Sequence, residues 1–322
     1  MTTLNRKRLI TPAIIQTLRT HPVILALIVL FVLFSALYPE RFLGALNFST
    51  ILRQFVTLTL FALGPSLVVL IGSLDLSYIG IWMLGSILVW LLTPILGLAS
   101  ILVFLVLGLV TGLLVGVVQV KAKIPSFILT LSLLVTYAGL TAYLSGGYPR
   151  SVQGYEFITA SLIPVIPTAF LLSIPIIAAA VFITKSTKIG TYLYAIGSNE
   201  EGARLAGINV DRYKILAFTL SGLFTGIGGL ILFQHMGGAA PIALNLNSMV
   251  YPLVAIVLGG TPLVGGSGGP QRTILGALTF AVVNRGLVLS LLNPEAIQLL
   301  LGLLLIVSIV VSSRGLKGVA VT

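Results

Sequence analysis

The fold is decided by the stretch LASILVFLVLGLVTGLLVGVV at residues 98–118, which contains no charged residue. A bilayer core about 30 Å thick needs roughly 20 mostly apolar residues for one helical crossing, and this stretch meets that requirement. Glycine recurs inside it at every fourth position, at Gly108, Gly112 and Gly116. Small residues at this spacing let two membrane helices approach closely. The stretch therefore predicts a spanning helix with a glycine face for a neighbouring helix.

Similar apolar runs lie on both sides of this stretch. Hydrophobic residues make up 57% and charged residues 8% of the 322, far from the composition of soluble proteins. We expect an all-α, polytopic membrane protein with about ten transmembrane helices in one transmembrane domain, residues 22–312. The expected helices lie near residues 22–38, 55–71, 78–92, 98–118, 126–144, 167–184, 215–233, 249–258, 273–292 and 296–311. The third and eighth runs are short, so eight crossings stay possible.

Basic residues are divided unevenly between the two sides that ten alternating crossings define. With the N-terminus in the cytoplasm, 14 Lys and Arg lie on the cytoplasmic side and three on the other, and Arg285 lies inside a helix. Cytoplasmic connections carry such an excess. We therefore expect a basic cytoplasmic N-terminus at 1–21 and a cytoplasmic tail at 313–322. The net charge of +11 is scattered, without the clustered basic patch of a nucleic-acid site.

The connection at 185–214 is the most polar part of the chain, with eight of the 25 charged residues. Ser198 and Glu201 have the spacing of a capping box, which predicts a helix that starts near Asn199. Gly207 is well placed to end it, because glycine adopts positive φ at low cost. So short a helix is not stable alone, and we expect it to be ordered by what it packs against.

Three motifs give the chain a resemblance to a known family. They are GSLDLS at 72–77, GSNEEGARLAGINV at 197–210 and LGGTPLVGG at 258–266. Together they resemble the membrane-spanning subunit of ATP-binding cassette (ABC) importers for monosaccharides of the ribose, xylose and galactose kind. Ser73 and Pro262 depart from that family's pattern. The resemblance extends from about Val23 to Val311.

The resemblance implies an assembly of several subunits in the bacterial inner membrane. It implies two permease subunits, identical or different, two cytoplasmic ATPase subunits, and an external binding protein that delivers a monosaccharide or similar small polar solute. Nucleosides, branched-chain amino acids and a quorum-sensing furanose are neighbouring possibilities. The chain has no Gly-x-x-x-x-Gly-Lys-Ser/Thr phosphate loop, so we expect a transporter subunit without enzyme activity, cofactor or metal, and ATP hydrolysis on a partner.

The same resemblance implies that the helix near 199–206 docks in a groove of the ATPase. Glu200, Glu201 and Arg204 would fix the register at the rim, and Ala203 and Leu205 would supply the buried contact. The alternative is an ordinary solvated loop. The full set expected at this interface is Ser198, Asn199, Glu200, Glu201, Ala203, Arg204, Leu205 and Gly207.

Asp75 is the only carboxylate between residues 55 and 92. A charge inside a membrane is costly, so the side chain needs a partner, a wet cavity or a position near the surface. Two roles stay open for it. Asp75 either caps the next helix by accepting amides around Ser77 and Tyr78, or it lines the solute path.

Arg285 lies well inside the expected helix at 273–292. It either pairs with a carboxylate such as Glu295 or with helix-end carbonyls, or it lines the path together with Asn284. Other polar residues on apolar helices either line the path or hydrogen-bond a neighbouring helix. These further candidates are Gln54, Gln119, Thr130 and Gln234.

Charged residues in the outer connections are candidates for docking the binding protein. They are Glu40, Arg41, Arg150 and Glu156, and plain solvation is the equal alternative. A serine protease built from Ser267 and His235 is disfavoured, because the expected topology separates the two by a membrane. An ion-coupled carrier is also disfavoured, because a proton relay needs several embedded ionisable groups.

Overall fold

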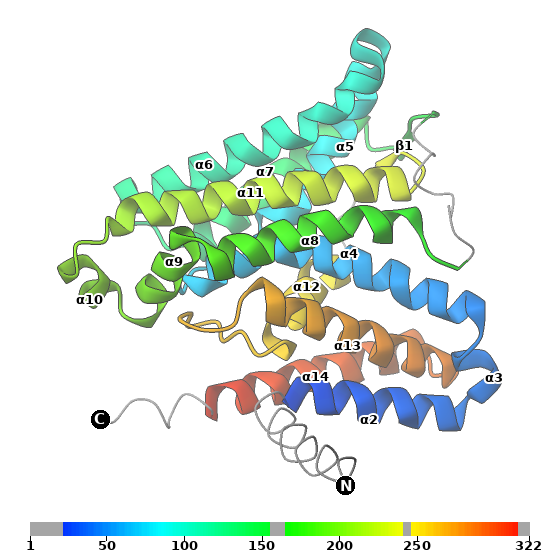
Figure 1. Ribbon diagram of the computed structural model, residues 1–322. Coiled ribbons are helices and arrows are strands. Elements are labelled where there is room, and N and C mark those ends of the chain that lie inside the picture. Colours follow the sequence, from blue (N-terminus) through cyan, green and yellow to red (C-terminus); the bar gives the residue numbers. More distant parts are fainter. Residues whose placement is uncertain (1–21, 155–164, 241–245, 315–322) are drawn as a thin grey trace, which may run out of the picture.

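The protein forms a bundle of long helices that run roughly side by side (Figure 1). The computed structural model describes residues 22–154, 165–240 and 246–314. The basic segment 1–21, Glu156 and most of the tail 313–322 lie outside the described residues. At one end of the bundle, α9 and α10 project beyond the other helices, and α3 and β1 lie at the opposite end. We refer to these as the α10 end and the α3 end.

Helices account for nearly all of the regular structure in the described residues. One short antiparallel pairing joins β1 (Arg150–Ser151) to β2 (Ala239–Ala240) at the α3 end. The helices are α2 (Pro22–Leu37), α3 (Pro39–Phe42), α4 (Ala45–Leu70), α5 (Ser77–Leu96), the 3₁₀ helix η1 (Gly97–Leu102), α6 (Val103–Ala122), α7 (Ser126–Ser145), α8 (Thr168–Ser186), α9 (Lys188–Ser198), α10 (Glu200–Leu205), α11 (Val210–His235), α12 (Leu246–Leu258), α13 (Pro270–Leu289) and α14 (Pro294–Arg314).

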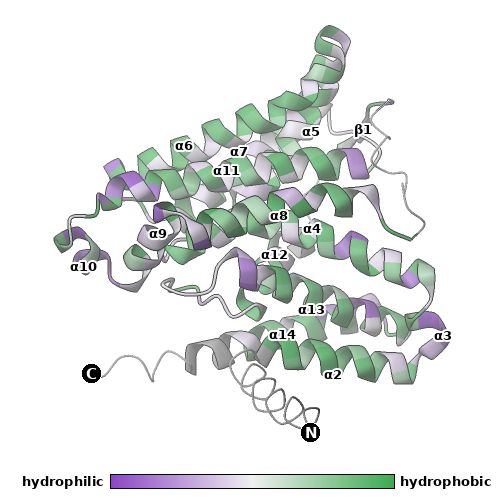
Figure 2. Ribbon diagram, in the orientation of Figure 1, coloured by the Kyte–Doolittle hydropathy of each residue, from purple (hydrophilic) through white to green (hydrophobic). Residues whose placement is uncertain are grey.

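The long helices are apolar enough to cross a membrane. The described residues contain six such stretches, the longest of which, Ser77–Ala122, comprises α5, η1 and α6. Three shorter apolar helices, Val23–Leu37, Met249–Leu258 and Pro294–Ser308, accompany them. Figure 2 shows hydrophobic residues dominating these helices and hydrophilic residues concentrated toward their ends. The expectation of an all-α, polytopic membrane protein is confirmed, and the number of crossings remains a prediction.

Two helices begin at least five residues earlier than expected, both because polar residues interrupt the apolar run. A connection is expected at 39–54, but α4 begins at Ala45, and the buried Asn47 amide donates to the Phe42 carbonyl (2.7 Å). A helix is expected from residue 215, but α11 begins at Val210, and its charged first turn lies beyond the apolar part. A polar residue ends an apolar run in a sequence, yet it does not end a helix.

Helix α11 packs mainly against α6 and α4. The predicted glycine face of α6 provides the first of these contacts. A methyl group at Gly108, Gly112 or Gly116 would meet the backbone of Gly222, Phe218 or Ile215 on α11. The two backbones therefore lie close enough that only glycine fits between them.

Enlarging a glycine in this contact should destabilise the fold. We expect Gly112→Leu to cost about 1–3 kcal/mol, because the new side chain must displace backbone rather than another side chain. Gly139→Leu is the matched control, since a methyl group at Gly139 on α7 would have no neighbouring atom within 4 Å. Thermal unfolding in detergent measures both variants. Equal midpoints would contradict the glycine contact.

Candidate coupling interface

The first motif forms a loop between α4 and α5 at the α10 end. Gly72 has φ of 71°, a left-handed conformation that favours glycine, and it turns the chain after the last residues of α4. The loop is tied on two sides, since the Leu74 amide donates to Ser126 Oγ of α7 (3.0 Å) and Gln119 Nε2 of α6 donates to Ser73 Oγ (3.1 Å). Irregular backbone at membrane depth is tolerated when it is buried in protein. These two bonds hold the loop against α6 and α7.

The third motif lies against the first. The Gly266 amide donates to the Leu70 carbonyl (2.9 Å), and Gly265 packs so closely on Gly72 that neither position has room for a side chain. Pro262, the departure from the family pattern, is accommodated because its carbonyl accepts the Gly265 amide in a tight turn (3.0 Å). The two loops form one layer.

The second motif lies against the third. Ser198 Oγ is 3.4 Å from the Gly266 carbonyl, and Tyr194 Oη of α9 donates to the Gly268 carbonyl (2.7 Å). Gln271 Nε2 of α13 donates to the same tyrosine oxygen (2.8 Å). Three segments that are far apart in the sequence therefore meet at the α10 end and support the polar segment 185–214.

The start of α10 differs from the predicted capping box. Ser198 is the last residue of α9, and its hydroxyl donates to the Tyr194 carbonyl (2.8 Å). Asn199 is the N-cap, and its Oδ1 accepts the Gly202 amide (2.9 Å). The capping box of Ser198 and Glu201 is therefore wrong, although the helix begins close to the expected residue. The contact with Gly266 favours keeping Ser198 in α9.

The end of α10 lies where the sequence predicts it. Gly207 has φ of 83°, its amide donates to the Arg204 carbonyl (3.1 Å), and the Ile208 amide donates to the Ala203 carbonyl (3.0 Å). This pair of bonds is a Schellman motif, which satisfies carbonyls that the last turn leaves free. The chain reverses there and enters α11.

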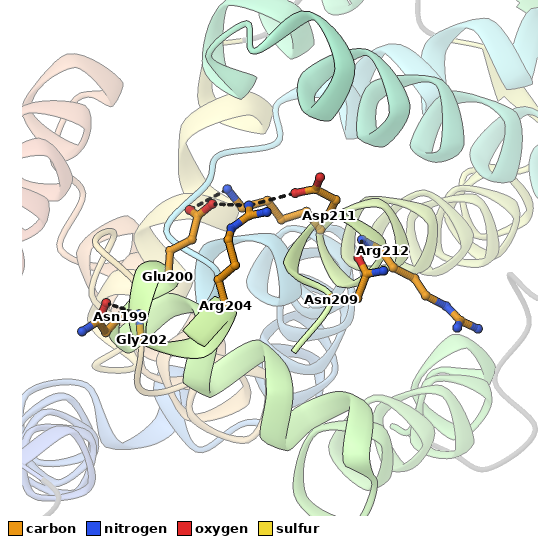
Figure 3. A network of polar contacts seen from close by, with 8 residues as sticks. Asn199, Glu200, Gly202, Arg204, Asn209, Asp211 and Arg212 are labelled. Atoms are coloured by element: carbon orange, nitrogen blue, oxygen red, sulfur yellow. Dashed lines mark hydrogen bonds and ion pairs between the residues drawn. The ribbon is translucent and has the colours of Figure 1, made fainter. Parts of the chain in front are cut away.

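Ion pairs fasten α10 to the first turns of α11 (Figure 3). Arg204 lies 3.0 Å from Asp211 and 3.7 Å from Glu200, and Lys214 lies 2.6 Å from Glu200. Asn209 caps α11 by accepting the Arg212 amide (3.0 Å). Exposed ion pairs contribute little to stability, commonly below about 1 kcal/mol each. Their effect here is orientation, because they link the two helices across a short turn.

The outward face of α10 is polar with one large apolar residue. Leu205 is 84% exposed, whereas Ala203 is 5% exposed and packs inside this subunit. The prediction that Ala203 contacts a partner is therefore wrong, because its side chain already anchors α10 to its own bundle. The remaining members of the predicted set form what we call the α10 surface: Ser198, Asn199, Glu200, Glu201, Arg204, Leu205 and Gly207.

Asp75 is buried, with 2% of its surface exposed, and it acts on the start of α5. Its Oδ1 accepts the Ser77 amide (2.9 Å) and the Ser77 hydroxyl (2.6 Å). The capping role expected around Ser77 is thus present, but the Tyr78 amide does not take part. The second carboxylate oxygen accepts Ser221 Oγ of α11 (2.7 Å), a partner that the sequence did not indicate.

Arg285 lies near the α3 end of α13 and not at mid-helix depth. Its Nε donates to Asn47 Oδ1 of α4. The expected pairing with Glu295 is wrong, because none of the ion pairs in the described ranges involves Arg285. Its neighbour Asn284 is partly buried. Arg285 therefore joins the α3-end parts of α13 and α4.

The remaining path candidates do not gather at one site. Thr130 is buried and donates to the Ser126 carbonyl of its own helix (2.9 Å), while Gln119 holds the first-motif loop. Gln234 is buried near the α3 end, and Gln54 is partly buried on α4. Ser132 and Thr136, which the sequence reasoning did not single out, are exposed hydroxyls one turn apart on the poorly covered helix α7, and each donates to a carbonyl of its own helix. Their four-residue spacing was the available signal.

At the α3 end, Glu40 and Arg41 of α3 are exposed as expected. Arg150 is less free, because its Nε donates to the Ser145 carbonyl (3.0 Å) and its guanidinium lies 4.6 Å from the centre of the Trp90 ring. His235 ends α11 at the α3 end and lies 3.4 Å from an Arg53 nitrogen. Ser267, in the loop at the α10 end, is separated from it by the length of α11, about 39 Å. These two residues do not form a protease site.

Comparison with known proteins identifies the family. The model of a family described as "Branched-chain amino acid transport system / permease component" matches residues 47–309. The chain belongs to this permease family. It is a transport permease and not an enzyme, which excludes the protease alternative. No solved structure matches the chain.

Its similar relatives carry the names of sugar permeases. The chain is 33% identical to the ribose import permease protein RbsC of Haemophilus influenzae, over 82% of this chain and 83% of that protein. It is 32% identical to RbsC of Escherichia coli K12, over 82% and 84%. It is 29% identical to the xylose transport system permease protein XylH of the same organism, over 84% and 85%. The resemblance read from the three motifs is thus confirmed.

The N-cap of α10 offers a local test. We expect Asn199→Ala to cost α10 about 1 kcal/mol, because the Gly202 amide loses its acceptor. Amide hydrogen exchange over residues 200–205 should then speed up about fivefold. Ser198→Ala is the control, since that hydroxyl bonds within α9 and its loss should leave exchange in α10 unchanged. A larger increase in exchange for Ser198→Ala than for Asn199→Ala would contradict the Asn199 cap and support the capping box of Ser198 and Glu201.

Proposed function

We propose that the chain is the membrane-spanning subunit of an ATP-driven importer for a monosaccharide or a similar small polar solute. The observation that carries this proposal is the likeness to ribose and xylose import permeases over more than four fifths of both chains. The meeting of three family-like motifs at the α10 end supports it, because a permease without a nucleotide site needs a surface on which a separate ATPase acts.

We further propose ten crossings in the bacterial inner membrane, with the α10 end in the cytoplasm. Seven long helices and three shorter apolar ones support this number when α5 and α6 count separately. The seven are α4, α5, α6, α7, α8, α11 and α13. The excess of Lys and Arg in connections at the α10 end supports the orientation. Both termini are then cytoplasmic.

In this proposal the α10 surface docks on the ATPase. Leu205 supplies the apolar contact, and Glu201, with the ion-paired Glu200 and Arg204, sets the register around it. An apolar contact surrounded by a polar rim is the general anatomy of a protein–protein interface. The fixed orientation of α10 on α11 then converts movement of the ATPase into movement of a membrane helix.

Two further partners complete the proposed assembly. A second permease subunit, either identical or related, completes the two-fold assembly, and an external solute-binding protein docks at the α3 end on Glu40 and Arg41. These exposed charges are suited to steering a partner and setting its orientation. Arg150 contributes less, because Ser145 and Trp90 already engage it.

The solute is uncharged in this proposal. Asp75 and Arg285, the charged groups expected on the path, already serve helix contacts. Hydroxyls and amides remain as path candidates, namely Ser132, Thr136, Gln54, Gln234 and Asn284. Such groups bind a sugar weakly, as a path requires, and leave selection to the external protein.

Reconstituted uptake tests the function. We expect proteoliposomes that hold the permease together with its ATPase and binding protein to take up labelled ribose or xylose only when ATP is supplied on the side of the membrane where the α10 surface lies. Excess unlabelled pentose should abolish uptake, and leucine should not compete. Competition by leucine alone would overturn the sugar assignment. Uptake by the permease without any ATPase would overturn the proposal itself.

Leu205 allows a sharper test of docking. We expect Leu205→Asp to weaken ATPase binding at least about tenfold, because a carboxylate replaces a buried apolar contact at the interface. Leu205→Met preserves the apolar contact and should bind nearly as well as the native chain. Pull-down of the ATPase by purified permease in detergent measures both. Equal retention of the ATPase by the two variants would place the docking site elsewhere.

A further inference from the structure

The carboxylate of Asp75 is held by three hydrogen-bond donors and lies among fully buried neighbours. The donors are the Ser77 amide, the Ser77 hydroxyl and the Ser221 hydroxyl. Ser77 is 1% exposed and Ser221 is 0% exposed. All three partners donate, so they suit a carboxylate, whose oxygens act as acceptors. Within the described ranges no ion pair includes Asp75, so the donors alone compensate its burial.

Ser221 is the single donor that comes from another helix. It lies about 16 Å along α11 from Val210, the first residue of that helix. Removing its hydroxyl leaves Asp75 Oδ2 buried without this donor, which is more costly than losing a bond at the surface. The Asp75–Ser221 bond therefore sets the position of the first-motif loop on α11.

Helix α11 is in turn fixed to α10. The pairs Arg204–Asp211 and Lys214–Glu200, together with the Asn209 cap, join the two helices at their shared turn. The close backbone contact of α11 with α6 favours movement as a rigid rod rather than bending. A displacement of α10 is then carried along α11 as far as Ser221.

Helix α5 continues the connection on the other side of Asp75. Tyr78 is the second residue of α5, is completely buried, and donates its hydroxyl to the Met249 carbonyl of α12. Its ring also packs on Phe61 of α4, with centroids 5.9 Å apart. The start of α5 is therefore bonded on two sides. Through Asp75 it is bonded to α11, which leads to the α10 end, and through Tyr78 it is bonded to α12, the helix that follows β2 in the chain.

We propose that Asp75, Ser221 and Tyr78 are positioning residues that transmit movement from the α10 surface to α12. We call this set the α5 link. Motion of α10 moves α11, the Ser221–Asp75 bond carries the start of α5 with it, and Tyr78 passes the shift to α12. Two discrete hydrogen bonds between otherwise rigid helices are suited to this, because packed interiors shift between arrangements rather than deform continuously. The link rests on the proposed coupling to an ATPase.

The ratio of solute imported to ATP hydrolysed tests the link. In proteoliposomes of the complete complex we expect Ser221→Ala and Tyr78→Phe each to lower this ratio about fivefold, the equivalent of one hydrogen bond. ATP hydrolysis should continue, because neither residue belongs to the α10 surface. Thr225→Val is the matched control, since Thr225 is buried one turn further along α11 and its hydroxyl has no hydrogen-bond partner among the described residues.

Thermal unfolding separates transmission from simple loss of stability. The proposal requires a lowered ratio in Ser221→Ala under conditions where the complex is assembled and folded to the same extent as Thr225→Val. A ratio equal to that of the native complex in both Ser221→Ala and Tyr78→Phe overturns it. Transport and hydrolysis that fall together in parallel with the melting temperature overturn it as well, because that is the outcome of a purely structural role.

A double variant tests whether Asp75 and Ser221 act through their shared bond. The ratio for Asp75→Ala combined with Ser221→Ala should equal that of Asp75→Ala alone, because removing the carboxylate already breaks the bond. Additive losses would show that the two residues act independently and would overturn the link. Failure of the native complex to import any solute with ATP would defeat the proposed function instead, so the two failures are distinguishable.

Discussion

The constraint on which the structure depends is the absence of water from the bilayer core, which obliges the backbone polar groups there to find partners within the protein. The loop at 71–76 shows how this is met. Its groups bond to α6, α7 and α11, and the carbonyl of Leu70, just before the loop, accepts the Gly266 amide. A segment that needs partners on every side fixes the positions of all the helices that supply them, and the α10 end is rigid for this reason.

The glycines extend the same argument to the helices. Where α6 meets α11, Gly108 and Gly222 leave no room for side chains, so the two backbones are in direct contact. Lipid supplies no hydrophobic force that drives helices together, and close packing is the main source of stability between them. The helix that follows the polar segment 185–214 is therefore also one that is held closely by its neighbours. Rigidity and position together suit α11 for transmitting force.

The sequence predicted those features that depend on local pattern. Apolar length indicated the spans, the four-residue glycine repeat indicated the face of α6, and Gly207 indicated the end of α10. Features decided by distant contacts were missed or misread. Ser198 and Asn199 are both competent caps, and the contact of Ser198 with Gly266 favours Asn199. For Ala203, the family resemblance implied contact with a partner. Nothing in the local sequence indicates that its side chain is buried within its own subunit.

The distribution of charge bears on what the permease selects. A fixed charge on the path would hold an oppositely charged solute and resist its release, whereas Asp75 and Arg285 are engaged in bonds between helices. The Asp75 carboxylate, which accepts three hydrogen bonds inside the protein, has little capacity left for a solute. In the proposed function, the permease distinguishes solutes mainly by size and by the absence of charge. Fine selection among neutral sugars has to come from a protein whose site is free to bind tightly, which is the role that the proposed assembly gives to the external partner.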